Sequence, residues 1–117
     1  MYNMNIEELK EFIIAELETR KAQDIEVIDV SNSGIAVYMI FASGRSSKNV
    51  SSIADALSTI IKDKTGLKVG LEGIKTGSWA ILDTQDIIVH IFHPEIRQYY
   101  NVEGIFSPSH HQAIEVR

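Results

Sequence analysis

The sequence EGIKTGSWAILDTQDIIVHIF, from Glu72 to Phe92, decides how this chain folds. It contains two short apolar runs, Trp79–Leu82 and Ile87–Phe92, with Thr84 and Gln85 in the polar segment between them. Apolar runs of this length, bounded by turn residues, predict β-strands. An aspartate on either side of Thr84 and Gln85 is typical of a hairpin turn. The stretch therefore predicts two neighbouring strands joined by a tight turn.

Two amphipathic helices are predicted upstream of this stretch. Apolar residues recur every three to four positions from Ile6 to Lys21, and Asn5 with Glu8 matches a capping box. The second helix follows a turn at Ser43–Ser47. Its apolar residues keep helical spacing towards Gly66, which is a typical C-terminal stop.

Further strands and a short helix complete the predicted secondary structure. Ile25–Val30 and Ile35–Ala42 are separated by the turn residues SNSG, which predicts an antiparallel hairpin. Another strand is expected at Leu67–Leu71, and Pro94–Tyr100 is expected to form a short helix. We therefore expect one α/β domain over residues 1–106. Residues 107–117 lack a structural pattern and are expected to be a loosely attached tail.

Length and composition fit one soluble globular domain. The chain has 117 residues, of which 44% are hydrophobic and 23% are charged, and such a chain can bury a core. No apolar run approaches the roughly 20 residues that span a bilayer, so no membrane association is expected. The absence of Cys excludes disulfides, thiolate zinc sites and a thiol nucleophile. Because the first residues are acidic, no secretory signal is expected, and the cytoplasm is the expected location.

The charge balance favours one class of partner. The 16 acidic residues outnumber the 11 basic ones, and the formal net charge is −5. A nucleic-acid binder needs a basic face to displace counterions from phosphates, so direct binding of RNA is not expected. A basic protein is the favoured partner, because opposite charges speed the encounter of two proteins.

One segment could bind an anion. Ser43–Lys48 precedes a predicted helix, and free backbone N–H groups at a helix start can hold a phosphate. Arg45 would add positive charge there. The spacing, however, matches neither a P-loop nor a dinucleotide-binding fingerprint. We therefore favour a capped helix start, with Ser46 or Ser47 as the cap.

A second segment could bind a cation. Asp83 and Asp86 offer the oxygen ligands that Mg²⁺ prefers. A third carboxylate would have to come from Asp29 or Glu72, and the sequence does not place either one nearby. The simpler interpretation is that the two aspartates flank a turn, and we expect no metal or other cofactor.

His90 and Trp79 are the remaining candidates for a functional role. His90 could form an acid/base couple with Asp83 or Asp86, but no nucleophile accompanies it, and a structural or contact role on a partly exposed sheet face is favoured. Trp79 is the only Trp of the chain. It either fills the core or anchors an interface, where Trp is enriched among the residues that dominate binding energy.

The chain resembles the ribosomal silencing factor family (RsfS, also called Iojap). The similarity spans about Ile6 to Phe106. Its first block is Ile40–Gly44 with Ser46 and Ser52–Asp55, which is similar to the family pattern ASG-S…IAD. Its second block consists of Glu72-Gly73, Trp79, Leu82-Asp83, Asp86 and Val89-His90-Ile91-Phe92, and Glu95, Arg97, Tyr99 and Tyr100 continue it.

This resemblance implies a mixed sheet flanked by helices, akin to nucleotidyltransferases but without known catalysis. It also implies binding to the large ribosomal subunit through the ribosomal protein numbered fourteen. Such binding would block joining of the small subunit and lower translation when nutrients are scarce. A homodimer of the free protein is a further implication of the family.

The chain departs from the family pattern at a few positions. The family usually has Asp-Tyr-Phe where Val37-Tyr38-Met39 stand, so an acidic group is missing there. Its Tyr-Gly is Thr84-Gln85 here, and its terminal Leu-Trp is Ile105-Phe106. The last change keeps two bulky apolar residues, so packing or docking at that position is expected to survive.

These observations lead to a hypothesis of a non-enzymatic ribosome-binding factor. The alternative is a nucleotide- and magnesium-dependent enzyme that uses the Gly44–Ser46 turn with Asp83 and Asp86. Under the leading hypothesis the partner-binding residues are Trp79, Ile81, Asp83, Asp86, His90, Phe92, Glu95, Tyr99 and Tyr100.

Overall fold

The computed structural model describes residues 4–100 and 114–116, with the side chains of residues 4–97. The elements of this part of the chain are α1 (Ile6–Thr19), β1 (Gln23–Asp29), β2 (Tyr38–Ser43), α2 (Ser47–Thr65), β3 (Gly70–Glu72), β4 (Trp79–Asp83), β5 (Ile87–Phe92), α3 (Pro94–Tyr100) and β6 (Ile114–Val116). The two strands and the turn predicted within Glu72–Phe92 are therefore confirmed as β4 and β5 with their connection, and the predicted short helix is confirmed as α3.

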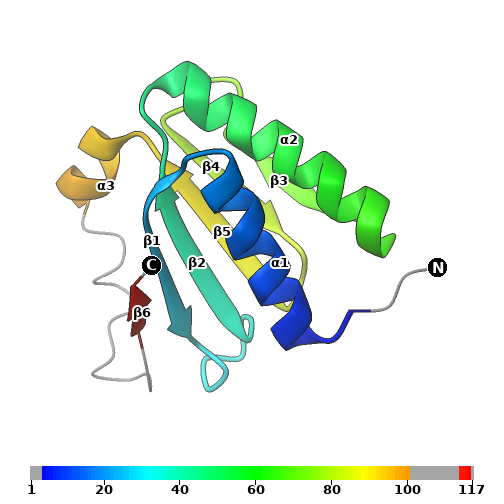
Figure 1. Cartoon of the computed structure of the whole chain (residues 1–117). Helices are drawn as coiled ribbons and strands as arrows, with labels where there is room; N and C mark the ends of the chain where they lie inside the picture. Colours follow the sequence, from blue (N-terminus) through cyan, green and yellow to red (C-terminus); the bar gives the residue numbers. More distant parts are fainter. Residues whose placement is uncertain (1–3, 101–113, 117) are drawn as a thin grey trace.

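The described strands form one mixed sheet in the spatial order β3-β4-β5-β2-β1-β6. The central strands β2 and β5 run parallel, and the other neighbours run antiparallel. Parallel neighbours need a long crossover connection, which α2, β3 and β4 provide. Helices α1 and α2 cover one face of the sheet (Figure 1). The predicted mixed sheet flanked by helices is confirmed, and the likeness to nucleotidyltransferases stays a prediction.

The main core lies between this helical layer and the sheet. Strand β2 is buried on both faces, which fits its continuous apolar sequence. Ile40 and Ala42 face the helices, whereas Met39 and Phe41 belong to a second cluster on the opposite face. Each fully buried large side chain contributes about 1.5–3 kcal/mol relative to its exposed state. The sheet is therefore stabilised from both sides.

The helix ends follow the capping signals in the sequence. The Asn5 side chain accepts a hydrogen bond from the Glu8 N–H, and the Glu8 carboxylate accepts one from the Asn5 N–H. Ser46 caps α2, and Gly66 ends it in the left-handed conformation with φ of 74°. Helix α1 ends before the predicted Lys21, whose φ of 61° breaks the helical backbone. No helix in the described part of the chain is long and apolar enough to cross a membrane.

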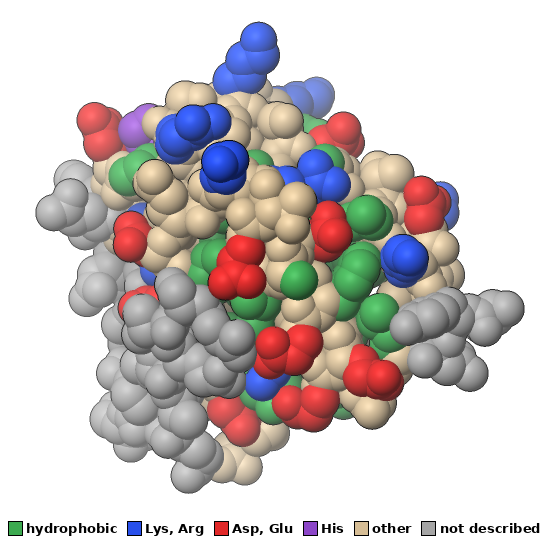
Figure 2. Space-filling model, in the orientation of Figure 1, with side chains coloured by type: hydrophobic (Ala, Val, Ile, Leu, Met, Phe, Trp, Pro, Cys, Tyr) green, Lys and Arg blue, Asp and Glu red, His purple; other side chains and the backbone are tan. Residues whose placement is uncertain are grey.

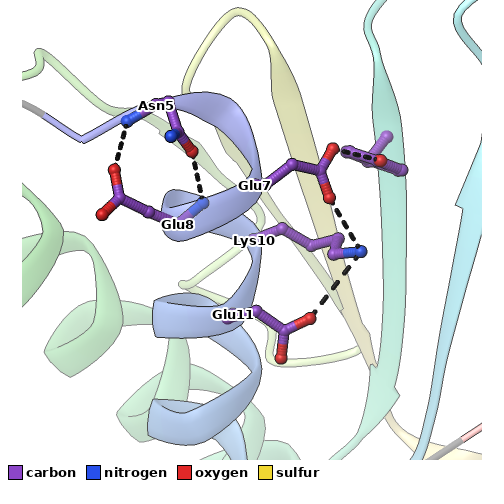
Figure 3. A network of polar contacts seen from close by, with 6 residues as sticks. Asn5, Glu7, Glu8, Lys10 and Glu11 are labelled. Atoms are coloured by element: carbon purple, nitrogen blue, oxygen red, sulfur yellow. Dashed lines mark hydrogen bonds and ion pairs between the residues drawn. The ribbon is translucent and has the colours of Figure 1, made fainter.

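A polar network joins the start of α1 to β2 (Figure 3). The Lys10 ammonium lies 3.2 Å from the Glu7 carboxylate and 3.7 Å from that of Glu11. It also lies 4.8 Å from the ring centroid of Tyr38, whose hydroxyl donates to Glu7. The hydrogen bond to Glu7, followed by burial, raises the pKa of Tyr38. Lys10 is buried, and the nearby carboxylates and the aromatic ring offset the cost of burying its charge.

Two predicted strand boundaries were wrong. The strand expected at Ile35–Ala42 begins only at Tyr38, and Ile35 is 56% exposed. The Val37 N–H donates to the Asp86 carbonyl. This bond holds residues 35–37 as a connection that precedes the pairing of β2 with β5. The strand expected at Leu67–Leu71 begins three residues later as β3. In both places an apolar residue at the surface extended the pattern without extending the strand.

The C-terminal tail was expected to be loosely attached, and this is wrong for residues 114–116. They form β6, which pairs antiparallel with β1 through the partners Glu26↔Val116 and Ile28↔Ile114. The residues of β6 carry no turn or helix signal, and their strand forms because the edge of β1 offers free backbone groups. Residues 107–113 lie outside the described part, and the domain boundary after residue 106 stays a prediction.

Candidate functional site

The sheet face opposite α1 and α2 carries the residues singled out in the sequence. Trp79, Ile81 and Asp83 alternate along β4, and the register places them opposite Phe92, His90 and Ile88 of β5. Trp79, Ile81 and Ile88 are half-buried, and Asp83 is exposed. We call these four residues, Trp79, Ile81, Asp83 and Ile88, the docking surface. It combines apolar side chains with an exposed carboxylate at one end.

His90 holds the indole ring of Trp79 in place. The Trp79 Nε1–H donates to His90 Nδ1 at 3.0 Å. Because Nδ1 accepts this bond, the ring proton sits on Nε2, which points at the Met39 sulfur at 3.2 Å. The His90 ring also stacks on Phe41, with centroids 4.9 Å apart and an interplanar angle of 16°. These contacts from β2, β4 and β5 orient one aromatic ring at the surface.

The environment of His90 excludes an acid/base couple with Asp83 or Asp86. His90 is only 5% exposed, and burial lowers its pKa from 6.5 to about 4. Both ring nitrogens are engaged, by Trp79 and by Met39, rather than by a carboxylate. Of the two roles expected for His90, the structural one is therefore supported, because burial leaves little of the ring for a direct contact. A neutral, buried imidazole at this position acts as a support for Trp79.

The lowered pKa of His90 predicts a loss of stability in acid. The unfolded chain binds the proton near pH 6.5 and the folded chain only near pH 4. The contribution of the neutral His90 to the free energy of unfolding is thus complete above about pH 6.5, and it is lost as pH falls towards 4. Between pH 7 and pH 4.5 the wild-type chain should lose about 2 kcal/mol more free energy of unfolding than His90→Gln. Urea denaturation of both chains at both pH values measures this, and identical losses would contradict it.

Asp83 and Asp86 flank a turn, as the simpler interpretation predicted. The Asp83 carboxylate accepts the Gln85 N–H at 2.7 Å, and Gln85 adopts a φ of 81°. The Thr84 hydroxyl donates to the Ile87 carbonyl at 2.7 Å and closes the turn. Within residues 4–97, whose side chains are described, no group of three His, Cys, Asp or Glu side chains could hold a metal ion.

The segment Ser43–Lys48 also follows its simpler interpretation. The Ser46 hydroxyl accepts the Asn49 N–H at 3.1 Å, and the Asn49 side chain accepts the Arg45 N–H at 2.8 Å. Gly44 is required by a close approach, since a Cβ there would lie 2.8 Å from a methyl group of Val50. The turn is thus a capped helix start. Its own side chains occupy N–H groups that a phosphate would need.

Helix α3 contributes the acidic residue Glu95 and a set of contacts of Arg97 that the sequence did not predict. Glu95 is exposed at its start. Arg97 reaches back to the sheet, where its guanidinium donates to the Ser43 hydroxyl at 2.9 Å and lies 3.3 Å from the Glu26 carboxylate. These two contacts join α3 to β2 and β1, so the local sequence could not reveal them. Tyr99 and Tyr100 belong to α3, and their side chains lie outside the described part.

A shallow cavity adjoins the edge of the sheet at β3. It has a volume of about 470 Å³ and is lined by residues 71–76, mostly with apolar atoms. Glu72 and Lys75 are the ionisable groups of this lining.

Comparisons of this sequence with known proteins agree on one family. The family described as "Ribosomal silencing factor during starvation" matches residues 3–117. A protein of Zymomonas mobilis named ribosomal silencing factor RsfS is 41% identical over 101 residues, which cover 86% of this chain and 76% of that protein. The RsfS of Bacillus subtilis is 31% identical over 88% of both chains. The chloroplastic Iojap protein of Arabidopsis thaliana is 31% identical over 74% of this chain and 36% of its own length.

Solved structures agree with these sequence matches. A crystal structure of a Chromobacterium violaceum protein superposes with a TM-score of 0.83 at 33% identity, covering 87% of this chain and 86% of that one. A Bacillus halodurans structure gives a TM-score of 0.74 at 29% identity, over 85% and 93% of the two chains. Sequence similarity and fold thus extend over nearly the same residues. The chain belongs to the ribosomal silencing factor family, RsfS or Iojap.

Proposed function

We propose that this chain is a cytoplasmic, non-enzymatic factor that binds the large ribosomal subunit and represses translation. It does so by contacting the ribosomal protein numbered fourteen and thereby blocking joining of the small subunit. The observation that carries this proposal is the docking surface, where a buried histidine fixes a half-buried Trp79. An ordered aromatic side chain loses little conformational entropy on binding, which is typical of residues that dominate interface energy.

The residues of the site divide into contacts and supports. Trp79 and Ile81 supply apolar contact area, since both are half-buried in the free chain. The exposed carboxylates of Asp83, Asp86 and Glu95 supply charges that match a basic ribosomal protein.

His90 and Phe92, which are 5% and 0% exposed, support the contact residues from beneath. Phe92 lies 5.1 Å from the Trp79 ring, centroid to centroid. In this proposal Tyr99 and Tyr100 extend the surface from α3, the helix that begins two residues after Phe92. The free chain is proposed to form a homodimer through apolar surface that the ribosomal protein would otherwise cover.

Sedimentation with purified ribosomal subunits tests this function. The chain should co-sediment with large subunits and remain in the supernatant with small ones. Pre-incubation with large subunits should also reduce the formation of complete ribosomes when small subunits are added. Failure to co-sediment with large subunits, even at low salt where charged contacts are strongest, would overturn the proposal.

A further inference from the structure

Three connections of the chain meet at one end of the sheet. Gln23 at the start of β1 pairs with Ser43 at the end of β2, and Ser43 pairs with Phe92 at the end of β5. Phe92 in turn pairs with Trp79 at the start of β4. This end therefore collects the α1–β1 turn, the β2–α2 turn and the β3–β4 loop. Their exposed basic side chains, which we call the basic end, are Lys21, Arg45, Lys48 and Lys75.

The β3–β4 loop is fixed against the start of α2. The Ser51 hydroxyl of α2 donates to the carbonyl of Ile74. Gly77 packs so closely that a Cβ at that position would lie 2.0 Å from the Ser47 carbonyl oxygen. Lys75 lies between these two contacts in sequence. The loop therefore keeps Lys75 beside the first turn of α2, where Lys48 lies.

The charges of this chain are segregated although its net charge is −5. Lys and Arg side chains gather over the start of α2 and the neighbouring connections, whereas Asp and Glu gather over the start of α1 (Figure 2). The first turn of α2 contains no acidic residue, so its helix dipole adds to the positive potential. The acidic residues at this end are Glu18, Asp24, Glu72 and Glu95, which belong to α1, β1, β3 and α3, whereas the β2–α2 turn and the first turn of α2 contain none.

We propose that the basic end binds the phosphate backbone of ribosomal RNA next to the protein that occupies the docking surface. This inference rests on the proposed function. Trp79 opens β4 two residues after Gly77, so the docking surface and the basic end share one end of the sheet. A large subunit presents basic protein and RNA phosphates side by side, and the segregated charges match each of them.

The overall negative charge predicted no direct binding of RNA, and the basic end is a local exception to that charge. The acidic face around the start of α1 repels phosphates, while the basic end attracts them. Together the two faces would orient the chain on the subunit. Four basic side chains are too few for tight binding of free RNA by a chain of this net charge, so the contact acts only once the docking surface is occupied.

The salt dependence of binding to large subunits tests the proposal. The triple variant Arg45→Gln, Lys48→Gln, Lys75→Gln removes three charges from the basic end. The matched control, Lys62→Gln, Lys64→Gln, Lys68→Gln, removes three exposed charges around the other end of α2. The first variant should bind about tenfold more weakly, and the slope of log K against log salt should fall by about two. The control should keep the wild-type slope.

The outcomes separate this inference from the proposed function. Equal slopes for both variants, or an unchanged slope for the basic-end variant, would overturn the inference while the wild-type chain still binds. Absence of wild-type binding would overturn the proposed function and the inference with it. A second arm uses the isolated ribosomal protein numbered fourteen. The basic-end variant should bind it with wild-type affinity, and an equal loss of affinity there would assign the basic end to protein contact instead of RNA.

Discussion

Replacing Trp79 with Ala is expected to weaken binding to the large ribosomal subunit by at least about thirtyfold. This corresponds to the loss of about 2 kcal/mol that marks a dominant interface residue. The expectation rests on the ordered indole, which His90 holds by a 3.0 Å hydrogen bond and which Phe92 contacts from below. Equilibrium binding of the fluorescently labelled chain to large subunits measures the change.

Two comparisons show whether this loss comes from the interface. Leu67→Ala truncates another exposed apolar side chain, 37% exposed and located beyond the C-terminal end of α2, and should leave affinity unchanged. Asp83→Lys should cause a smaller loss of affinity, and this loss should shrink as salt is added. Exposed charges at the rim of an interface mainly affect the rate of association. Thermal unfolding of each variant identifies any loss of folded chain. Equal affinity of the folded Trp79→Ala and Leu67→Ala chains would remove Trp79 from the interface.

Replacing Gly77 with Ala is expected to lower the free energy of unfolding by more than about 2 kcal/mol. Gly77 has a φ of 67°, which an L-residue adopts only with strain. Its added Cβ would also lie 2.0 Å from the backbone oxygen of Ser47, which a side-chain rotation cannot relieve. The β3–β4 loop must therefore move away from α2. Urea denaturation monitored by Trp fluorescence reports both the stability and the environment of Trp79.

Gly34→Ala is the matched control for this effect. Gly34 has a similar φ of 78°, but no atom lies within 4 Å of the position of its added Cβ. The cost at Gly34 is therefore limited to backbone strain, about 1 kcal/mol. The difference between the two variants isolates the contact with Ser47. Equal destabilisation by both substitutions would show that the loop does not depend on this contact.

The elements predicted most accurately were those with regular spacing and a clear end signal. The helix spacing and the caps at Asn5, Ser46 and Gly66 fixed α1 and α2 to within a few residues. Strand starts were less accurate where an exposed Ile35 or Leu67 prolonged an apolar run. Local sequence cannot distinguish a buried apolar residue from an exposed one, because that difference depends on which distant strand pairs beside it.

The candidate site could be predicted in outline but not in its hydrogen bonding. Every second residue of β4 and β5 shares a face with Trp79 and His90, a pattern that follows from strand alternation. The link from Trp79 to His90 and on to Met39 depends on the pairing of three strands. That pairing also buries His90, which favours the structural role over the contact role. Ile88 lies on the same face by its spacing from His90, although it was not singled out as a contact.

The parallel pairing of β2 with β5 has a consequence for the order in which this chain folds. The β1–β2 and β4–β5 hairpins join strands that are close in sequence, whereas β2 and β5 are separated by α2, β3 and β4. Loop-closure entropy therefore makes β2–β5 pairing a late and slow step. The Met39 side chain reaches His90 only through that step. We expect the subunit-binding form to mature last, after the final strands have left the ribosome that synthesises them.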